Sequence, residues 1–229
     1  MPSDPSSRSD ASPISQDSGA ALTTAAADTS DGGALVLPGD YSQRTSVADL
    51  EARFGRANVK IVEGPANNGP SDYSVELFPD DPLRRAYVAF HYQQASGGVA
   101  SISVRDAGSL WRGKHGVHVG MSFANLRKLN GKPFLFSGFD GDHRGWVRDQ
   151  WSPALDGDDG TLGALDVGEN EHMYFGVDLG LRGRINDRAA GTYPIDDSIS
   201  SDDPRYPRLG ELVEISAIVA YTSLDDEWE

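Results

Sequence analysis

A ten-residue phrase occurs twice in this chain, with the copies 76 residues apart. Residues 46–55 read SVADLEARFG and residues 122–131 read SFANLRKLNG, with Ser, Ala, Leu and Gly at matching positions. This offset is too long for a solenoid repeat and fits the duplication of a half-domain. Neither copy carries a reactive side chain, so the repeat predicts an architecture and leaves function to other segments.

Each copy has the pattern of a short helix. In the first copy, Ser46 is the expected N-cap, and Asp49 stands three residues later, as in a capping box. Leu50 and Phe54 fall on one face of the helix, which is therefore the face expected to be buried. Gly55 can adopt the positive φ that ends many helices.

Four strand-like segments follow each helix, separated by clusters of Gly, Pro and Asn. They lie at 59–63, 74–78, 86–92 and 99–105 in the first half, and at 134–139, 146–151, 173–179 and 212–221 in the second. In the last segment Val213, Ile215, Ala217 and Val219 alternate with other residues and are expected to share the buried face. The sequence therefore predicts an α+β fold with two tandem repeats, each one helix on a four-stranded antiparallel sheet.

The formal net charge of −15 is concentrated in a few segments. Residues 1–33, 156–159, 196–203 and 225–229 hold the whole acidic excess, so the rest of the chain is close to neutral. Such a distribution describes solvated segments and argues against nucleic-acid binding.

The composition divides the chain into three parts. Residues 1–34 form a Ser-, Ala- and Asp-rich leader that is expected to be disordered, and residues 224–229 form an acidic tail. Between them, residues 35–223 are expected to fold as one domain of two repeats, about 35–110 and 111–223. No run of apolar residues is long enough for a transmembrane helix.

Two compartments are consistent with these features. A periplasmic or secreted protein would have lost a signal or lipoprotein leader, whereas a cytoplasmic protein would need none. The absence of cysteine excludes disulfides and thiolate metal sites but does not decide between these alternatives.

The second helix is preceded by Gly120, Met121 and Ser122, and Leu126 follows within it. With the helix-plus-meander pattern of both halves, this phrase resembles the tandem-repeat fold of beta-lactamase inhibitory proteins. A related motif occurs in the small lipoprotein of the outer-membrane assembly machinery. The resemblance implies two helix-plus-four-strand units and a protein-binding role. Those inhibitors normally carry disulfides and this chain has no cysteine, so the identity of a partner does not carry over. Residues 138–142 also resemble a Gly-Phe-x-x-Asp phrase of uncharacterised bacterial proteins.

Aromatic residues supply the candidate binding surface. Trp146 and Trp151 fall on opposite faces of their predicted strand, so one of them should be exposed. An exposed Trp beside arginine is a common anchor in protein interfaces, although either Trp could instead pack in the core. The candidate binding residues are Trp146, Arg148, Trp151, Arg144 and Phe139.

Catalytic and metal-binding alternatives rest on acidic residues and histidines. Asp140, Asp142 and His143, with His118, could form the site of a hydrolase or metal-dependent enzyme if they converged in one cleft. The acidic run Asp156, Asp158 and Asp159 has the oxygen density of a calcium loop but lacks the Gly and Glu positions of an EF-hand. No cofactor is expected, apart from incidental calcium at that run.

The sequence favours a non-catalytic function. We expect a periplasmic or secreted protein that binds another macromolecule, namely another protein, as an inhibitor does. The two alternatives are the enzyme described above and a cytoplasmic immunity-type protein.

Overall fold

The two copies of the repeated phrase form helices α1 (Val47–Phe54) and α2 (Phe123–Asn130). The computed structural model describes residues 35–63, 73–140, 144–147, 173–182, 193–195 and 198–222. The chain divides into two units, 1–30 and 31–229, and all described residues belong to the second.

Both helices begin after the predicted N-cap serine and end at the predicted glycine. The Ser46 side chain accepts a hydrogen bond from the Asp49 amide, and the Asp49 carboxylate accepts one from the Ser46 amide at 2.9 Å, which completes a capping box. Ser122 caps α2 by accepting from the Asn125 amide. The helix-ending Gly55 has a φ of 83°, which favours glycine.

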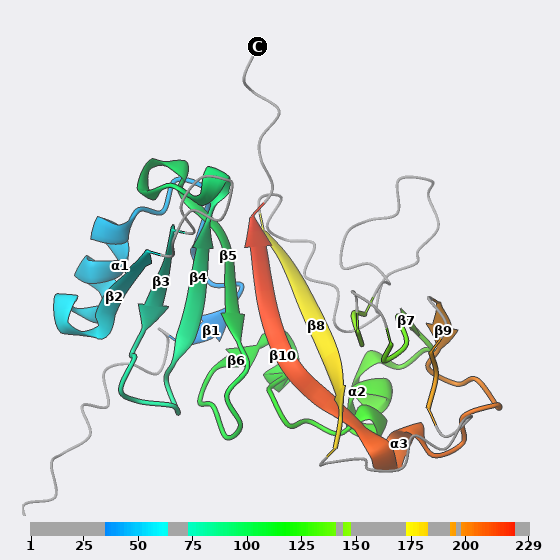
Figure 1. Ribbon diagram of the computed structural model, residues 1–229. Coiled ribbons are helices and arrows are strands. Elements are labelled where there is room, and N and C mark those ends of the chain that lie inside the picture. The colour runs from blue at the N-terminus through cyan, green and yellow to red at the C-terminus, as the bar shows by residue number, and fades with distance from the viewer. Residues whose placement is uncertain are drawn as a thin grey trace, which may run out of the picture. The chain divides into compact units, whose positions relative to one another are not determined.

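The largest sheet has six antiparallel strands in the order β2-β3-β4-β5-β10-β8 (Figure 1). Its strands are β2 (Val59–Glu63), β3 (Tyr73–Leu77), β4 (Ala86–Phe90), β5 (Val99–Val104), β8 (Met173–Leu181) and β10 (Val213–Thr222). Two small sheets pair β1 (Val36–Leu37) with β6 (Arg112–Gly113) and β7 (Leu135–Phe136) with β9 (Ile199–Ser200). The α+β class and the antiparallel sheet are confirmed.

The first half follows the predicted order of one helix and four strands, with small changes at the strand ends. Strand β4 ends at Phe90, and His91 begins the short 3₁₀ segment η3 (His91–Gln93), in which Tyr92 adopts a φ of 56°.

The second half departs further from the prediction. The expected strand 134–139 is reduced to the two residues of β7. Trp146 and Val147 make only isolated bridges, to Asp178 and Phe136 respectively, and the rest of the expected strand 146–151 lies outside the described residues. Among the described residues of this half, β8 and β10 alone join the main sheet, so a second four-stranded unit is not established.

A β-bulge in β10 corrects the predicted core face. The pairing with β8 shifts between Ile215 and Ala217, so the inward side changes phase at this point. Ile218 and Ala220 are therefore fully buried beyond the bulge, whereas Ala217 and Val219 point to the other face. Val219 is still buried, with 5% of its surface exposed, and Ala217 is half-buried. The prediction is therefore wrong about the face on which these two residues lie, and right that Val219 is buried.

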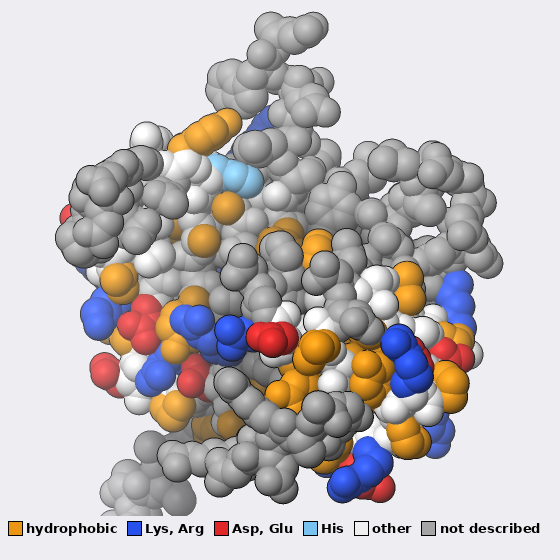
Figure 2. Space-filling model, turned by 45° about the vertical axis from the view of Figure 1, so that its right-hand side comes forward, with side chains coloured by type: hydrophobic (Ala, Val, Ile, Leu, Met, Phe, Trp, Pro, Cys, Tyr) orange, Lys and Arg blue, Asp and Glu red, His pale blue; other side chains and the backbone are white. Residues whose placement is uncertain are grey.

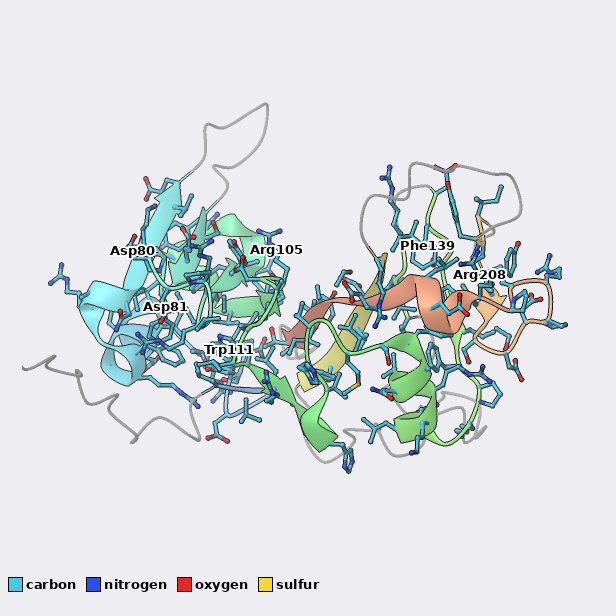
Figure 3. All side chains as sticks on the ribbon, turned by 90° about the horizontal axis from the view of Figure 1, so that it is seen from below. Asp80, Asp81, Arg105, Trp111, Phe139 and Arg208 are labelled. Carbon is cyan, nitrogen blue, oxygen red and sulfur yellow. The ribbon has the colours of Figure 1, made fainter. Side chains whose placement is uncertain are left out.

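Two aromatic clusters fill the core beneath the helices. Phe54 of α1 packs against Phe78 and Trp111, with ring centroids 5.4 and 6.2 Å apart. Phe123 of α2 packs against Phe134 and Phe136, both at 5.6 Å. Seen from below, α1, α2 and Trp111 lie on one side of the sheet and Arg105 lies on the other (Figure 3). This arrangement leaves the second side as the candidate surface.

Candidate functional site

The binding residues predicted from the sequence have different environments. Trp146 is 40% exposed, and Arg144 is also exposed. Arg148 and Trp151 lie outside the described residues. Trp146 therefore has the exposure that an interface anchor needs.

Phe139 is half-buried within the aromatic cluster of the second half. Its ring lies 6.0 Å from that of Phe136 and 6.4 Å from that of Tyr193, and its amide donates to the Pro194 carbonyl at 2.9 Å. These contacts give Phe139 a packing role that joins the segment 193–195 to the core.

The described part of the alternative catalytic site is spread over separate loops. Asp140 is exposed, and a ring nitrogen of His118 lies 2.8 Å from the Gly116 carbonyl. Asp142 and His143 lie outside the described residues, as do Asp156, Asp158 and Asp159 of the predicted calcium run. Among the described residues, no group of three or more acidic or histidine side chains could hold a metal ion.

The side of the main sheet away from α1 and α2 forms what we call the outer sheet face. No described helix packs on this face. In Figure 2, hydrophobic side chains lie beside charged ones on the visible surface of the described residues. Strand register assigns these residues to the outer sheet face: Lys60, Val62, Ser74, Glu76, Tyr87, Ala89, Ser101, Ser103, Trp146, Gly176, Asp178, Ala217, Val219 and Tyr221. Of these, Gly176 and Val219 are buried.

In the first half, the acidic groups near the outer sheet face are paired. Glu76 lies 3.7 Å from the Lys60 ammonium and 3.4 Å from the Arg85 guanidinium. Arg85 also lies 3.8 Å from Asp106. These contacts neutralise the charges of this region within the chain.

Asp178 is different, because no described residue forms a hydrogen bond or an ion pair with its carboxylate. Strand register places it opposite Ala217 on one side and Trp146 on the other. Gly176 and Gly180 are its neighbours on the same face of β8, so no side chain on its own strand screens it. A carboxylate that no described residue pairs with thus lies among small residues beside an exposed tryptophan.

Tyr221 lies on the same side of Asp178 as Ala217, because both residues belong to β10. A Cβ atom added to Gly176 would lie 2.8 Å from Cε2 of Tyr221, which shows that this ring lies over the glycine. Burial raises the pKa of Asp178. Burial and, to a smaller extent, the charge of Asp178 raise the pKa of the Tyr221 phenol. Tyr221 therefore stays neutral near physiological pH and is 39% exposed.

The sequence analysis did not single out Asp178. Its signal is the stretch 176–180, Gly-Val-Asp-Leu-Gly, in which a carboxylate takes an alternate position of an otherwise apolar strand. That stretch is typical of an ordinary strand with a turn, and only the register shows that Trp146 and Tyr221 flank the carboxylate.

A second surface feature is an open cleft of about 440 Å³ at the C-terminal end of α2. It is lined by Ala124, Arg127, Lys128, Gly131, Lys132 and Pro133. Cations near the last turn of a helix stabilise its dipole, so these side chains have a structural explanation.

Comparisons with protein-family models, curated proteins and solved structures found no match. Among the described residues, no helix is both long and apolar enough to cross a membrane.

Proposed function

We propose that this chain is a non-catalytic protein that binds another protein through its outer sheet face. The observation that carries the proposal is the exposure of Trp146 and Tyr221 on one side of a sheet whose other side packs on both longer helices. Large aromatic side chains contribute most of the binding free energy in many interfaces. Ala217 and Gly176, which lie on the strands between these two rings, have no side chain beyond a Cβ atom.

The proposal includes a duplicated architecture, as in the inhibitor proteins that the chain resembles. Helices α1 and α2 are each eight residues long and start 76 residues apart, and each starts from a Ser N-cap. The last strands of the two halves, β5 and β10, pair with each other within the main sheet. We place such a binding protein in the periplasm or outside the cell, and fractionation of the native host tests that assignment.

Site-specific photo-crosslinking in the native host tests the binding function. Ala89 is exposed on the outer sheet face, and Ala124 is an equally small, exposed residue on α2. Each would be replaced by p-benzoylphenylalanine in the full chain. Irradiation should join the Ala89 variant to one discrete second protein and leave the Ala124 variant unlinked.

Two results would contradict the proposal. An adduct from Ala124 alone would place the interface at the basic cleft of α2, which Ala124 lines. An adduct between two copies of this chain at Ala89 would make the outer sheet face a self-association surface.

A further inference from the structure

We propose that Asp178 receives an arginine side chain of the protein partner. This inference deepens the protein-binding function proposed above and rests on it. It names the chemistry of the partner at one point of the outer sheet face, where the carboxylate lies between Trp146 and Ala217.

Among the described residues, the neighbours of the Asp178 carboxylate on the outer sheet face of β8 and β10 are small, and none of them pairs with it. The flanking Gly176 and Gly180 carry no side chains, and the opposite Ala217 reaches only to its Cβ atom. Ser216, at the bulge, donates its hydroxyl to the main-chain carbonyl of Asp178 at 3.2 Å and not to the carboxylate. The position of Asp178 is fixed by the sheet, while its charged group keeps its hydrogen-bonding capacity.

Charge complementarity defines the occupant. Glu76 on the same face already has two cationic neighbours within the chain, whereas Asp178 has none among the described residues. A carboxylate held partly out of water and without a counter-charge is unfavourable, and a cation from a partner removes that cost. The raised pKa of Asp178, caused by burial, agrees with this environment.

The aromatic neighbours favour arginine over lysine. A guanidinium is planar, pairs with a carboxylate through two parallel hydrogen bonds, and stacks on aromatic rings. The chain itself shows this contact on the outer face, where Arg105 lies 3.8 Å from the centroid of the Tyr87 ring. Trp146 and Tyr221 offer rings on either side of Asp178.

A pair of small probes tests the inference on the full chain. N-acetyl-arginine amide carries the guanidinium, and N-acetyl-citrulline amide has nearly the same shape without the charge. NMR titration should show that the arginine probe shifts the Trp146 indole signal and lowers the pKa of the Asp178 carboxyl. The citrulline probe should cause neither change.

Two variants provide matched controls. Asp178→Asn keeps the shape of the side chain and should weaken binding of the arginine probe about tenfold, since a charge-assisted pair is lost. Glu76→Gln removes a carboxylate of the same face that is already paired and should leave probe binding unchanged. Equal weakening by both variants, or equal binding of both probes, would overturn the inference. A lysine probe that binds as tightly as the arginine probe would overturn the assignment to arginine.

The crosslinking experiment separates this inference from the function on which it rests. If Ala89 captures a partner but the arginine probe binds no better than citrulline, the arginine site is wrong and the protein-binding function stands. If Ala89 captures no partner, both proposals are wrong. If Ala89 captures a partner and Asp178→Asn weakens its binding as it weakens the probe, both are supported.

Discussion

Replacing Asp178 with Asn should stabilise the folded chain at neutral pH. Burial raises the pKa of Asp178, so the fold favours the neutral carboxyl. The stability that this preference contributes is complete below the unfolded-state pKa of about 3.9 and is lost as the pH rises through the folded-state pKa. At pH 7 the wild-type chain carries the unfavourable charge and the Asn variant does not.

The size of the gain follows from the environment of the side chain. An unpaired polar group withdrawn from water costs about 1–3 kcal/mol in mutational studies. Asp178 is only partly buried by its neighbours, so we expect the lower end, about 1 kcal/mol at pH 7. For a domain of this size, that corresponds to a rise in melting temperature of about 2–4 °C.

Urea unfolding from about pH 4 to pH 8 measures the effect. The difference in unfolding free energy between Asp178→Asn and wild type should be small at the acidic end, rise with pH and then level off. Carbon NMR titration of Asp178 gives its folded-state pKa independently. The plateau should be about 1.4 kcal/mol for each unit by which that pKa exceeds the unfolded-state value. A variant that is less stable than wild type at pH 7 would refute the reasoning, because the carboxylate would then have a favourable partner.

Three further predictions concern the scaffold. Ser46→Ala should destabilise the chain by about 1 kcal/mol and Ser122→Ala by less, because only the first cap is a complete capping box, and urea midpoints measure both. Gly98→Ala should lower the melting temperature far more than Gly120→Ala. Both positions have positive φ, but an added methyl group at Gly98 would overlap a backbone carbonyl, whereas one at Gly120 would enter open space. Similar drops in melting temperature for the two variants would contradict this account. Burial lowers the pKa of His91, so the fold favours the neutral ring. The folding stability that this preference contributes is complete above the unfolded-state pKa of about 6.5 and is lost as the pH falls through the folded-state pKa. His91→Asn should reduce the acid-induced loss of stability in urea titrations, and an unchanged loss would show that other groups cause it.

The two longer helices could be predicted because their signals are local. Ser46 and Asp49 specify a capping box within four residues, and Gly55 marks the end of the helix. The strands of the first half follow from the same short-range alternation. Such patterns need no knowledge of which strands become neighbours.

The second half was harder to predict for physical reasons. A single extra residue at the bulge near Ser216 turns Ile218 toward the core cluster and turns Val219, which is also buried, to the opposite face of the sheet. Alternation alone does not reveal where the phase changes. The candidate site has the same dependence on tertiary structure. Asp178 acquires its aromatic neighbours only through pairing with residues far away in the sequence.

Affinity measurements with the partner that Ala89 captures test the central claim most directly. Trp146→Ala and Tyr221→Ala remove exposed aromatic rings from the outer sheet face, while Leu83→Ala and Leu110→Ala remove comparably exposed apolar side chains from loops. Calorimetry should show each aromatic variant binding at least about tenfold more weakly, since hot-spot truncations cost about 2 kcal/mol or more, and both leucine variants binding like wild type. Wild-type affinity of both aromatic variants, with weakening by a leucine variant, would contradict the assignment of the outer sheet face as the binding surface.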